Sequence, residues 1–228
     1  MAKISKNVTL NEYQGFIFSV YGFPDDRNFT TNDMLVNVQR FLMKGLKGIR
    51  KDDIEKTKLN LLISLSWAMS LLNRLHVKIE DEVWHRFPYV CSHCGACPCL
   101  CDKKGAKKRK KIKINNKLRP KNIQQFQKMF ERIYPSNKRN LENAGIHLAE
   151  ELGELSEAVL AYRGSHSEKD FNNIKLEAAD LISCLFAAFN SMKLNLAKEL
   201  SVMFTNNCHE CKKSPCICNF RNIVNFRS

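Results

Sequence analysis

Residues 147–164 read HLAEELGELSEAVLAYRG. The apolar side chains of this stretch recur at helical spacing along one face: Leu148, Leu152, Leu155, Val159 and Tyr162. Gly164 stands where such a helix would end. Three more helices are predicted around it, at 123–134, 178–189 and 194–204, and no stretch shows a convincing strand alternation. The sequence therefore predicts an all-α fold, with about four helices in this half of the chain.

The first half of the chain resembles the second half. CSHCGACPCLC at 91–101 and CHECKKSPCIC at 208–218 lie 117 residues apart and share the same Cys spacing and one Pro. Upstream, the same offset aligns Phe87 with Phe204, and Tyr13-Gln14 matches Phe126-Gln127 at an offset of 113. One four-residue insertion or deletion reconciles the two offsets. We infer an internal duplication, with helical domains at 1–101 and 122–228.

A basic segment separates the two halves. The 228 residues include 37 Lys+Arg and 23 Asp+Glu, for a formal net charge of +14, and residues 102–121 contribute +10 of it. A charged run that is poor in apolar residues is typical of a solvated linker, which is the role predicted for 102–121. Weak, sequence-independent contact of 103–121 with nucleic-acid phosphates is the alternative.

Composition excludes several classes of protein. With 44% apolar residues the chain can bury a core, so wholesale disorder is excluded. The longest apolar stretch, 61–72, is interrupted by serines and is too short to span a bilayer, so no membrane partner is expected. The N-terminal MAKISKNVTL has no apolar signal core, which predicts a cytoplasmic protein.

Acidic residues recur on two predicted helices of the second half. Glu151 and Glu154 are three residues apart, as are Glu177 and Asp180, and this step puts each pair on one helix face. If the two helices pack side by side, four carboxylates converge, and a hard divalent cation such as Mg²⁺ is their natural partner. Asp180 lies inside the apolar run AADLISCLFAAF, where an unpaired carboxylate is costly. The alternative is that the acids of 150–157 form only the solvated face of an amphipathic helix.

The first half offers an internal comparison. At the offset of 117, Glu177 corresponds to Asn60 and Asp180 to Ile63. The region that matches the acidic helix, 34–47, contains no acid at all. Because the same scaffold exists without these carboxylates, chemistry explains them better than folding does.

Glu150-Glu151-x-x-Glu154 followed by Glu177-x-x-Asp180 resembles the signature of the MazG-like all-α nucleoside triphosphate pyrophosphohydrolases, over about residues 122–207. The resemblance implies a four-helix module that assembles as a dimer or higher oligomer. It also implies Mg²⁺-dependent hydrolysis of a nucleoside triphosphate to the monophosphate and pyrophosphate. By position, it implies Mg²⁺ ligands at Glu151, Glu154, Glu177 and Asp180, with Glu150 as an auxiliary carboxylate that orients or deprotonates water.

The resemblance extends to other residues and to the architecture. The family often has a basic residue and an Asn in its last helix, and Lys198 and Asn207 are the nearest candidates for binding substrate. The first half would be a degenerate module that pairs with the second as an intramolecular pseudo-dimer.

Trp84, beside Arg86, is a candidate wall for a base pocket, whereas Trp67 is expected in the core. A rival hypothesis is a zinc-containing nucleic-acid-binding or regulatory protein with a relic hydrolase motif.

Ten cysteines in a chain without an export signal indicate metal ligands rather than disulfides. Four thiolates within eleven residues suit a tetrahedral Zn²⁺ with a structural role, which predicts one metal knuckle at the end of each half. The predicted ligands are Cys91, Cys94, Cys99 and Cys101 in the first half, and Cys208, Cys211, Cys216 and Cys218 in the second. An iron–sulfur cluster and redox or disulfide chemistry are the alternatives. Cys97 and Cys184 are left over, and His93 and His209 are not expected to bind metal because the sulfur count is already complete.

Overall fold

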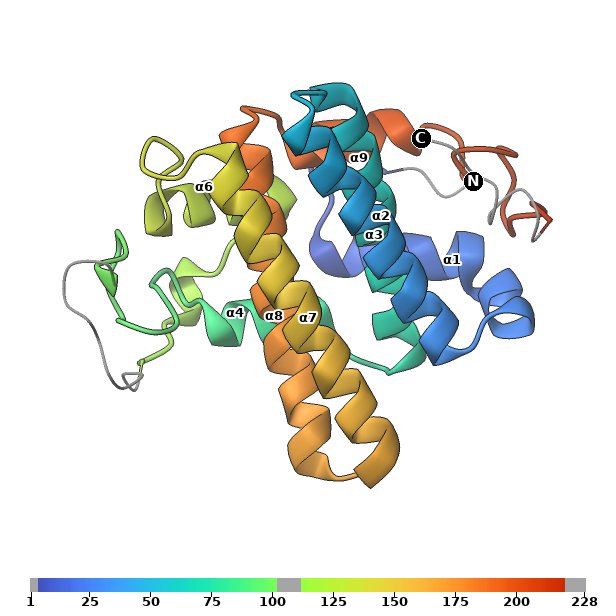
Figure 1. Cartoon of the computed structure of the whole chain (residues 1–228), viewed down its shortest axis with the longest axis horizontal. Helices are drawn as coiled ribbons and strands as arrows, with labels where there is room; N and C mark the ends of the chain where they lie inside the picture. The colour runs from blue at the N-terminus through green and yellow to red at the C-terminus, as the bar shows by residue number, and fades with distance from the viewer. Residues whose placement is uncertain (1–3, 102–111, 220–228) are drawn as a thin grey trace. The chain divides into compact units, whose positions relative to one another are not determined.

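The computed structural model describes residues 4–101 and 112–219 (Figure 1). Over these residues the regular elements are all helices, which confirms the predicted all-α class. The chain forms two compact units, unit 1 with residues 1–78 and 197–228 and unit 2 with residues 79–196. Among the described residues, no helix has the length and apolar character needed to cross a membrane.

Unit 1 combines three helices of the first half with the last helix of the chain. These are α1 (Leu10–Asn28), α2 (Thr31–Arg50), α3 (Ile54–Arg74) and α9 (Leu196–Met203). Capping boxes begin α1 and α2, because Thr9 and Thr30 each accept a hydrogen bond from the backbone of the N3 residue, whose acidic side chain bonds back. α2 packs along α3, and α1 packs against α3. Gly48 lets α2 and α3 approach closely, since a Cβ there would lie 2.5 Å from Oγ1 of Thr57.

Unit 2 is built around a long helical pair. Its elements are α4 (Ile79–Arg86), the 3₁₀ turn η1 (Asn116–Leu118), α6 (Ile123–Ile133), α7 (Leu141–Ser165) and α8 (Glu168–Ser191). α7 packs along α8, and α4 and α6 also contact α8 (Figure 1). α6 agrees with its predicted range to within one residue, and α8 extends beyond its predicted range at both ends. α7 continues one residue past Gly164 to Ser165, and the C-cap residue His166 follows with a left-handed φ of 51°.

Positions related by the two sequence offsets make the same hydrogen bonds in both units. In unit 1 the side-chain amide of Asn73 donates to the carbonyl oxygen of Gln14 at 3.0 Å. In unit 2 the side-chain amide of Asn190 donates to the carbonyl oxygen of Gln127 at 3.1 Å. The two halves therefore share a polar contact between their first and third helices as well as a sequence pattern.

Each unit also contains one Cys-rich loop, and each loop comes from the opposite half of the chain. In unit 1 the backbone N–H of Cys216 donates to the carbonyl oxygen of Val20 in α1 at 2.7 Å. In unit 2 the backbone N–H of Cys99 donates to the carbonyl oxygen of Ile133, the last residue of α6, at 2.8 Å. The last helix and Cys loop of each half thus belong to the unit that holds the first three helices of the other half.

Candidate metal centres

The predicted carboxylates lie on facing positions of α7 and α8 in unit 2. One oxygen from each of Glu151, Glu177 and Asp180 lies within 4.8 Å of the other two. Glu154 is exposed but close enough for its carboxyl group to share a hydrogen bond with Glu177. The structure therefore brings three of the predicted residues together and places Glu154 at their rim.

Glu150 does not join this cluster. Its side chain is 59% exposed, and its Oε2 lies 2.9 Å from Nδ1 of His147, one turn earlier on α7. Its predicted role as an auxiliary carboxylate for water stays a prediction.

A basic residue that was not predicted from the sequence lies in the cluster. Arg86, the last residue of α4, donates from Nε to Oδ1 of Asp180 at 3.0 Å and from Nη2 to Oδ2. The two side chains are only 9% and 11% exposed. The signal that would have found Arg86 is its match at the offset of 117, Met203, because the half without the paired carboxylates carries a base where the other half has an apolar residue.

The cluster holds more negative than positive charge. Three carboxylates meet one guanidinium, and Oε2 of Glu151 and Oε2 of Glu177 are buried without a hydrogen-bond partner among the described residues. Burial first, and the neighbouring carboxylates second, raise the pKa of Glu151 to about 8 and that of Glu177 to about 7. Burial lowers the pKa of Arg86, but its hydrogen bond to Asp180 and the nearby negative charges outweigh this and raise it. A donor set of oxygens with unbalanced charge and two buried oxygens without partners fits a hard divalent cation.

The predicted substrate-binding residues belong to unit 1. Lys198 is exposed on α9. Asn207 is 8% exposed, has a φ of 58°, and donates from Nδ2 to the carbonyl oxygen of Lys212 at 3.4 Å. Since the carboxylates belong to unit 2, the predicted role of both residues in binding substrate stays a prediction.

Both predicted cysteine sets converge. Within each set the four Sγ atoms lie within 4.8 Å of one another: Cys91, Cys94, Cys99 and Cys101, and Cys208, Cys211, Cys216 and Cys218. The closest sulfur pairs are 3.5–3.9 Å apart in both sets. Four sulfurs bound to a tetrahedral Zn²⁺ at about 2.3 Å lie about 3.8 Å apart, whereas a disulfide needs about 2.05 Å. Both sets can therefore bind a metal such as zinc.

Backbone N–H groups and a tyrosine surround these sulfurs. The N–H of Leu100 lies 3.4 Å from Sγ of Cys94. Burial raises the pKa of Cys94, but the N–H groups of Leu100 and Ala96 outweigh it and lower the pKa to about 6. Tyr134 contacts the first set through Cys91, and Tyr21, its match at the offset of 113, contacts the second set. Such contacts orient metal-binding thiolates and stabilise their charge.

The remaining cysteines and histidines lie outside the two sulfur sets. Cys97 is exposed. Cys184 lies on α8 near the carboxylate cluster, where burial first and the charge of Glu151 second raise its pKa to about 12. His93 approaches one set from outside, with Nδ1 3.7 Å from Sγ of Cys101, and Nδ1 of His209 lies 3.1 Å from the hydroxyl of Tyr21.

The basic segment is only partly within the described residues. Residues 102–111 lie outside them, so the predicted contact with nucleic acid is not placed there. The described part is held to α4, because Arg119 donates to the carboxylates of Glu80 at 3.1 Å and Asp81 at 2.6 Å. Nε1 of Trp84 donates to Oδ1 of Asn116 at 2.8 Å. These contacts make residues 116–119 part of unit 2.

No protein-family model, curated protein or solved structure matches this chain. The interpretation of the site therefore depends on its own residues. These are an oxygen cluster with one arginine in unit 2, and one four-sulfur set in each unit.

Proposed function

We propose that this chain is a Mg²⁺-dependent nucleoside triphosphate pyrophosphohydrolase of the MazG-like type, with its active site in unit 2. The single observation that carries the proposal is the group of Glu151, Glu177 and Asp180, with two buried carboxylate oxygens that have no hydrogen-bond partner in the part of the chain that the structure describes. A purely structural cluster would satisfy these oxygens with hydrogen-bond donors, because a buried unpaired carboxylate costs several kcal/mol. A divalent cation and a polyanionic substrate account for the arrangement.

The residues of the cluster suggest a division of roles. Glu151, Glu177 and Asp180 would hold the Mg²⁺, with Glu154 at the open side. When bound there, Mg²⁺ supplies charge neutralisation for the triphosphate and a water of lowered pKa. Arg86 bonds to both oxygens of Asp180 and is only 9% exposed, so it would orient this carboxylate and balance part of the negative charge next to the metal ligands.

We propose further that the two halves are tandem modules that arose by duplication and exchanged their last helix and Cys loop. The matching hydrogen bonds of Asn73 and Asn190, and of Cys216 and Cys99, support this view. In this arrangement the active module receives Arg86 from the first half, while the first half itself lacks the carboxylates. The Zn²⁺ sites have a structural role, because four thiolates leave no open position for substrate.

The test is an assay of pyrophosphate release from each common ribonucleoside and deoxyribonucleoside triphosphate with Mg²⁺. We expect activity with at least one nucleotide, and a loss of about 100-fold or more in the double variant Glu151→Gln/Asp180→Asn. Glu157→Gln is the matched control, since Glu157 is an exposed carboxylate on the same helix and should keep full activity.

Thermal unfolding separates loss of chemistry from loss of fold. Glu151→Gln alone replaces a carboxyl group that is costly to ionise, with its pKa raised to about 8, by a neutral amide, so this single variant should unfold at the same or a higher temperature while losing activity. Full activity in the double variant, or no pyrophosphate from any nucleotide with the intact protein, would contradict the proposed function.

A further inference from the structure

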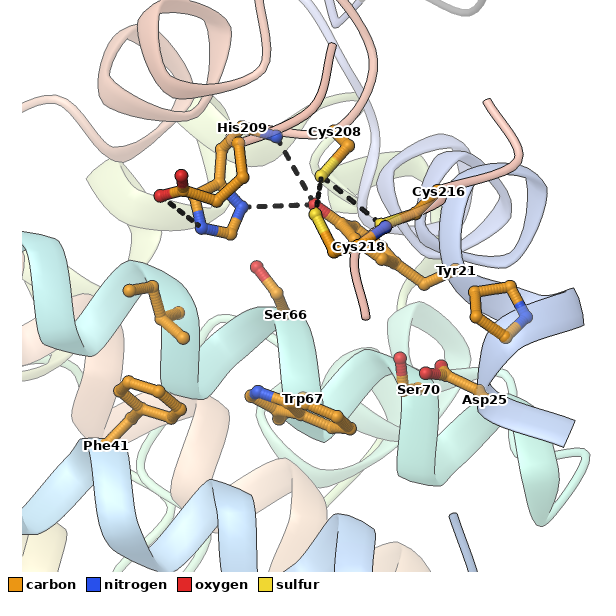
Figure 2. Close-up of a pocket in the computed structure, with 13 residues that line it drawn as sticks. Tyr21, Asp25, Phe41, Ser66, Trp67, Ser70, Cys208, His209, Cys216 and Cys218 are labelled. Carbon is orange, nitrogen blue, oxygen red and sulfur yellow. Dashed lines mark hydrogen bonds and ion pairs between the residues drawn. The ribbon is translucent and has the colours of Figure 1, made fainter. Parts of the chain in front are cut away.

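A second candidate site lies in unit 1, and it contains none of the carboxylates discussed above. A cavity of about 70 Å³ opens between α1, α2, α3 and the second Cys loop (Figure 2). One water needs about 10–15 Å³ by the same kind of measure, so the cavity has room for several waters or for one small ring. All of its lining residues belong to unit 1.

Aromatic side chains form much of the wall of this cavity, and Cys208, Cys216 and Cys218 of the second sulfur set also line it. Figure 2 shows Phe41 and Trp67 on one side and Tyr21 and His209 across from them. Trp67 is held in place by an edge-to-face contact with Phe29, at 5.0 Å between ring centroids. The expected roles of the two tryptophans are thereby reversed, because Trp84 is 0% exposed and Trp67 is the half-buried one that lines a pocket. Aromatic walls of this kind favour a flat ring that can stack on them.

One end of the cavity is polar. The carboxyl group of Asp25 lies beside the hydroxyl of Ser70, its hydrogen-bond partner, and both line the cavity (Figure 2). Asp25 is only 6% exposed, and burial raises its pKa to about 7 although Ser70 and Arg74 partly offset this. A carboxyl group in this range presents a donor and an acceptor side by side.

The charge of the lining excludes an anionic ligand. Among the described residues that line the cavity none is Lys or Arg, whereas Asp25 and Glu210 are acidic. A phosphate or carboxylate would be repelled there and would find no cationic partner. An occupant without negative charge, flat, about one ring in size, and able to pair with a carboxyl group at one edge fits this lining.

We propose that this cavity binds a small uncharged heteroaromatic ring that carries a hydrogen-bond donor next to an acceptor, as the edge of a pyrimidine base does. The ring stacks on Trp67, and its polar edge pairs with Asp25 and Ser70. This site is separate from the proposed hydrolase centre, and its ligand is recognised by the ring rather than by phosphate.

Fluorine NMR of the full chain labelled with 5-fluorotryptophan tests the proposal. The chain has two tryptophans, so two signals are expected, and a Trp67→Phe variant assigns them. Titration with uracil should shift the Trp67 signal in a saturable way and leave the signal of the buried Trp84 unchanged. An unresponsive Trp67 signal up to the solubility limit of uracil would overturn the proposal.

Two comparison ligands test the class of compound. Dihydrouracil keeps the donor and acceptor but is not a flat aromatic ring, and toluene keeps the ring but lacks the polar edge. Each should bind about tenfold or more weakly than uracil, because each loses one of the two kinds of contact. Equal affinity for toluene would show an apolar cavity only, and equal affinity for dihydrouracil would show that stacking is not needed. Either result rejects the proposed class.

Variants of Asp25 test the polar edge. Asp25→Asn keeps a donor and an acceptor at the same place and should bind uracil within about threefold of the unmodified chain, whereas Asp25→Leu should lose about tenfold or more. Because Trp84 belongs to unit 2, folding of each variant is checked by its circular dichroism spectrum and by a cooperative thermal transition like that of the unmodified chain. If Asp25→Leu does not fold, Ser70→Ala removes the second polar group at the same edge and should weaken binding. If the folded variant, Asp25→Leu or Ser70→Ala, binds uracil with full affinity, the proposed contact between uracil and this polar edge is rejected.

Discussion

Two buried aspartates show how differently the same residue is accommodated in the two units. Asp180 in unit 2 is paired with Arg86 through both of its oxygens. Asp25 in unit 1 has a cation nearby, but Arg74 donates to its backbone carbonyl at 3.2 Å and to the carboxylate of Asp26 at 2.9 Å. Asp25 is therefore buried without a cation on its carboxyl group, and burial raises its pKa from 3.8 to about 7.

A pH-dependent stability follows for Asp25. Because the pKa of Asp25 is higher in the folded state, its contribution to stability is fully present below about pH 4 and is lost as the pH rises through about 7. Asp25→Asn cannot ionise, so it should be more stable than the unmodified chain by about 2–4 kcal/mol at pH 8.5, and the difference should shrink toward pH 4.5.

Urea unfolding at both pH values measures this effect. Asp52→Asn is the control, because it makes the same chemical change at an exposed position. Its effect on the free energy of unfolding should be similar at both pH values. An equal effect of Asp25→Asn at the two pH values would show that Asp25 stays ionised when buried.

At the scale of elements, each Cys loop connects a short helix to a longer one. α4 and α9 have eight residues each, which is too short for stable helix formation in isolation. Each is followed by a Cys loop whose backbone bonds to a longer helix: the N–H of Cys99 donates to Ile133 at the end of α6, and the N–H of Cys216 donates to Val20 in the middle of α1. Metal binding would therefore fix the position of both short helices.

The metal content provides the corresponding prediction. We expect two Zn²⁺ per chain by elemental analysis, and one in the variant Cys91→Ser/Cys99→Ser, with a loss of several kcal/mol of stability. Cys97→Ser is the matched control, since Cys97 lies between the ligands but is exposed, and it should keep both ions. Two or more iron atoms per sulfur set would show that the cysteines bind an iron–sulfur cluster instead of zinc. Less than one metal ion per chain would contradict both the zinc and the iron–sulfur hypotheses.

The elements were largely predictable because their signals are local. α6 begins one residue after Asn122, whose side chain caps it, and α7 carries the apolar spacing of Leu148, Leu152 and Leu155. Spacing also predicted that Glu151, Glu177 and Asp180 meet, because two helices that pack side by side bring such pairs together. Arg86 was not predicted, because its partner is 94 residues away and no periodicity connects them.

At the scale of the whole chain, the composition of the units could not be read from the sequence. The predicted domains, 1–101 and 122–228, follow the sequence repeat. In the structure, unit 1 contains α9 from the second half, and unit 2 contains α4 from the first half. An exchange of matching segments keeps a similar apolar pattern, so hydrophobic periodicity does not distinguish the two arrangements. They differ in single positions such as Arg86 and Met203 and in the connecting segments, which the apolar pattern does not show.

Cleavage of the chain provides the test of the exchange. With a protease site inserted between residues 106 and 107, in the basic segment, the two fragments should remain one particle in size-exclusion chromatography after cutting. Each unit would still contain segments of both fragments, and a zinc chelator should weaken their association. If the fragments separate at low concentration into two folded pieces, each half keeps its own last helix and the exchange is wrong.

The pairing of Arg86 with Asp180 determines which of the two short helices, α4 or α9, must lie beside the carboxylates, but not the order of the two halves along the chain. The guanidinium is encoded before the carboxylates, and the matching positions of the other unit carry Met203 and Ile63. A circular permutation that joins the two ends and opens the basic segment would leave every residue of the oxygen cluster in place. Replacing α4 by the sequence of α9 would instead set a thioether beside the buried aspartate, so the two helices are interchangeable as shapes but not as chemistry.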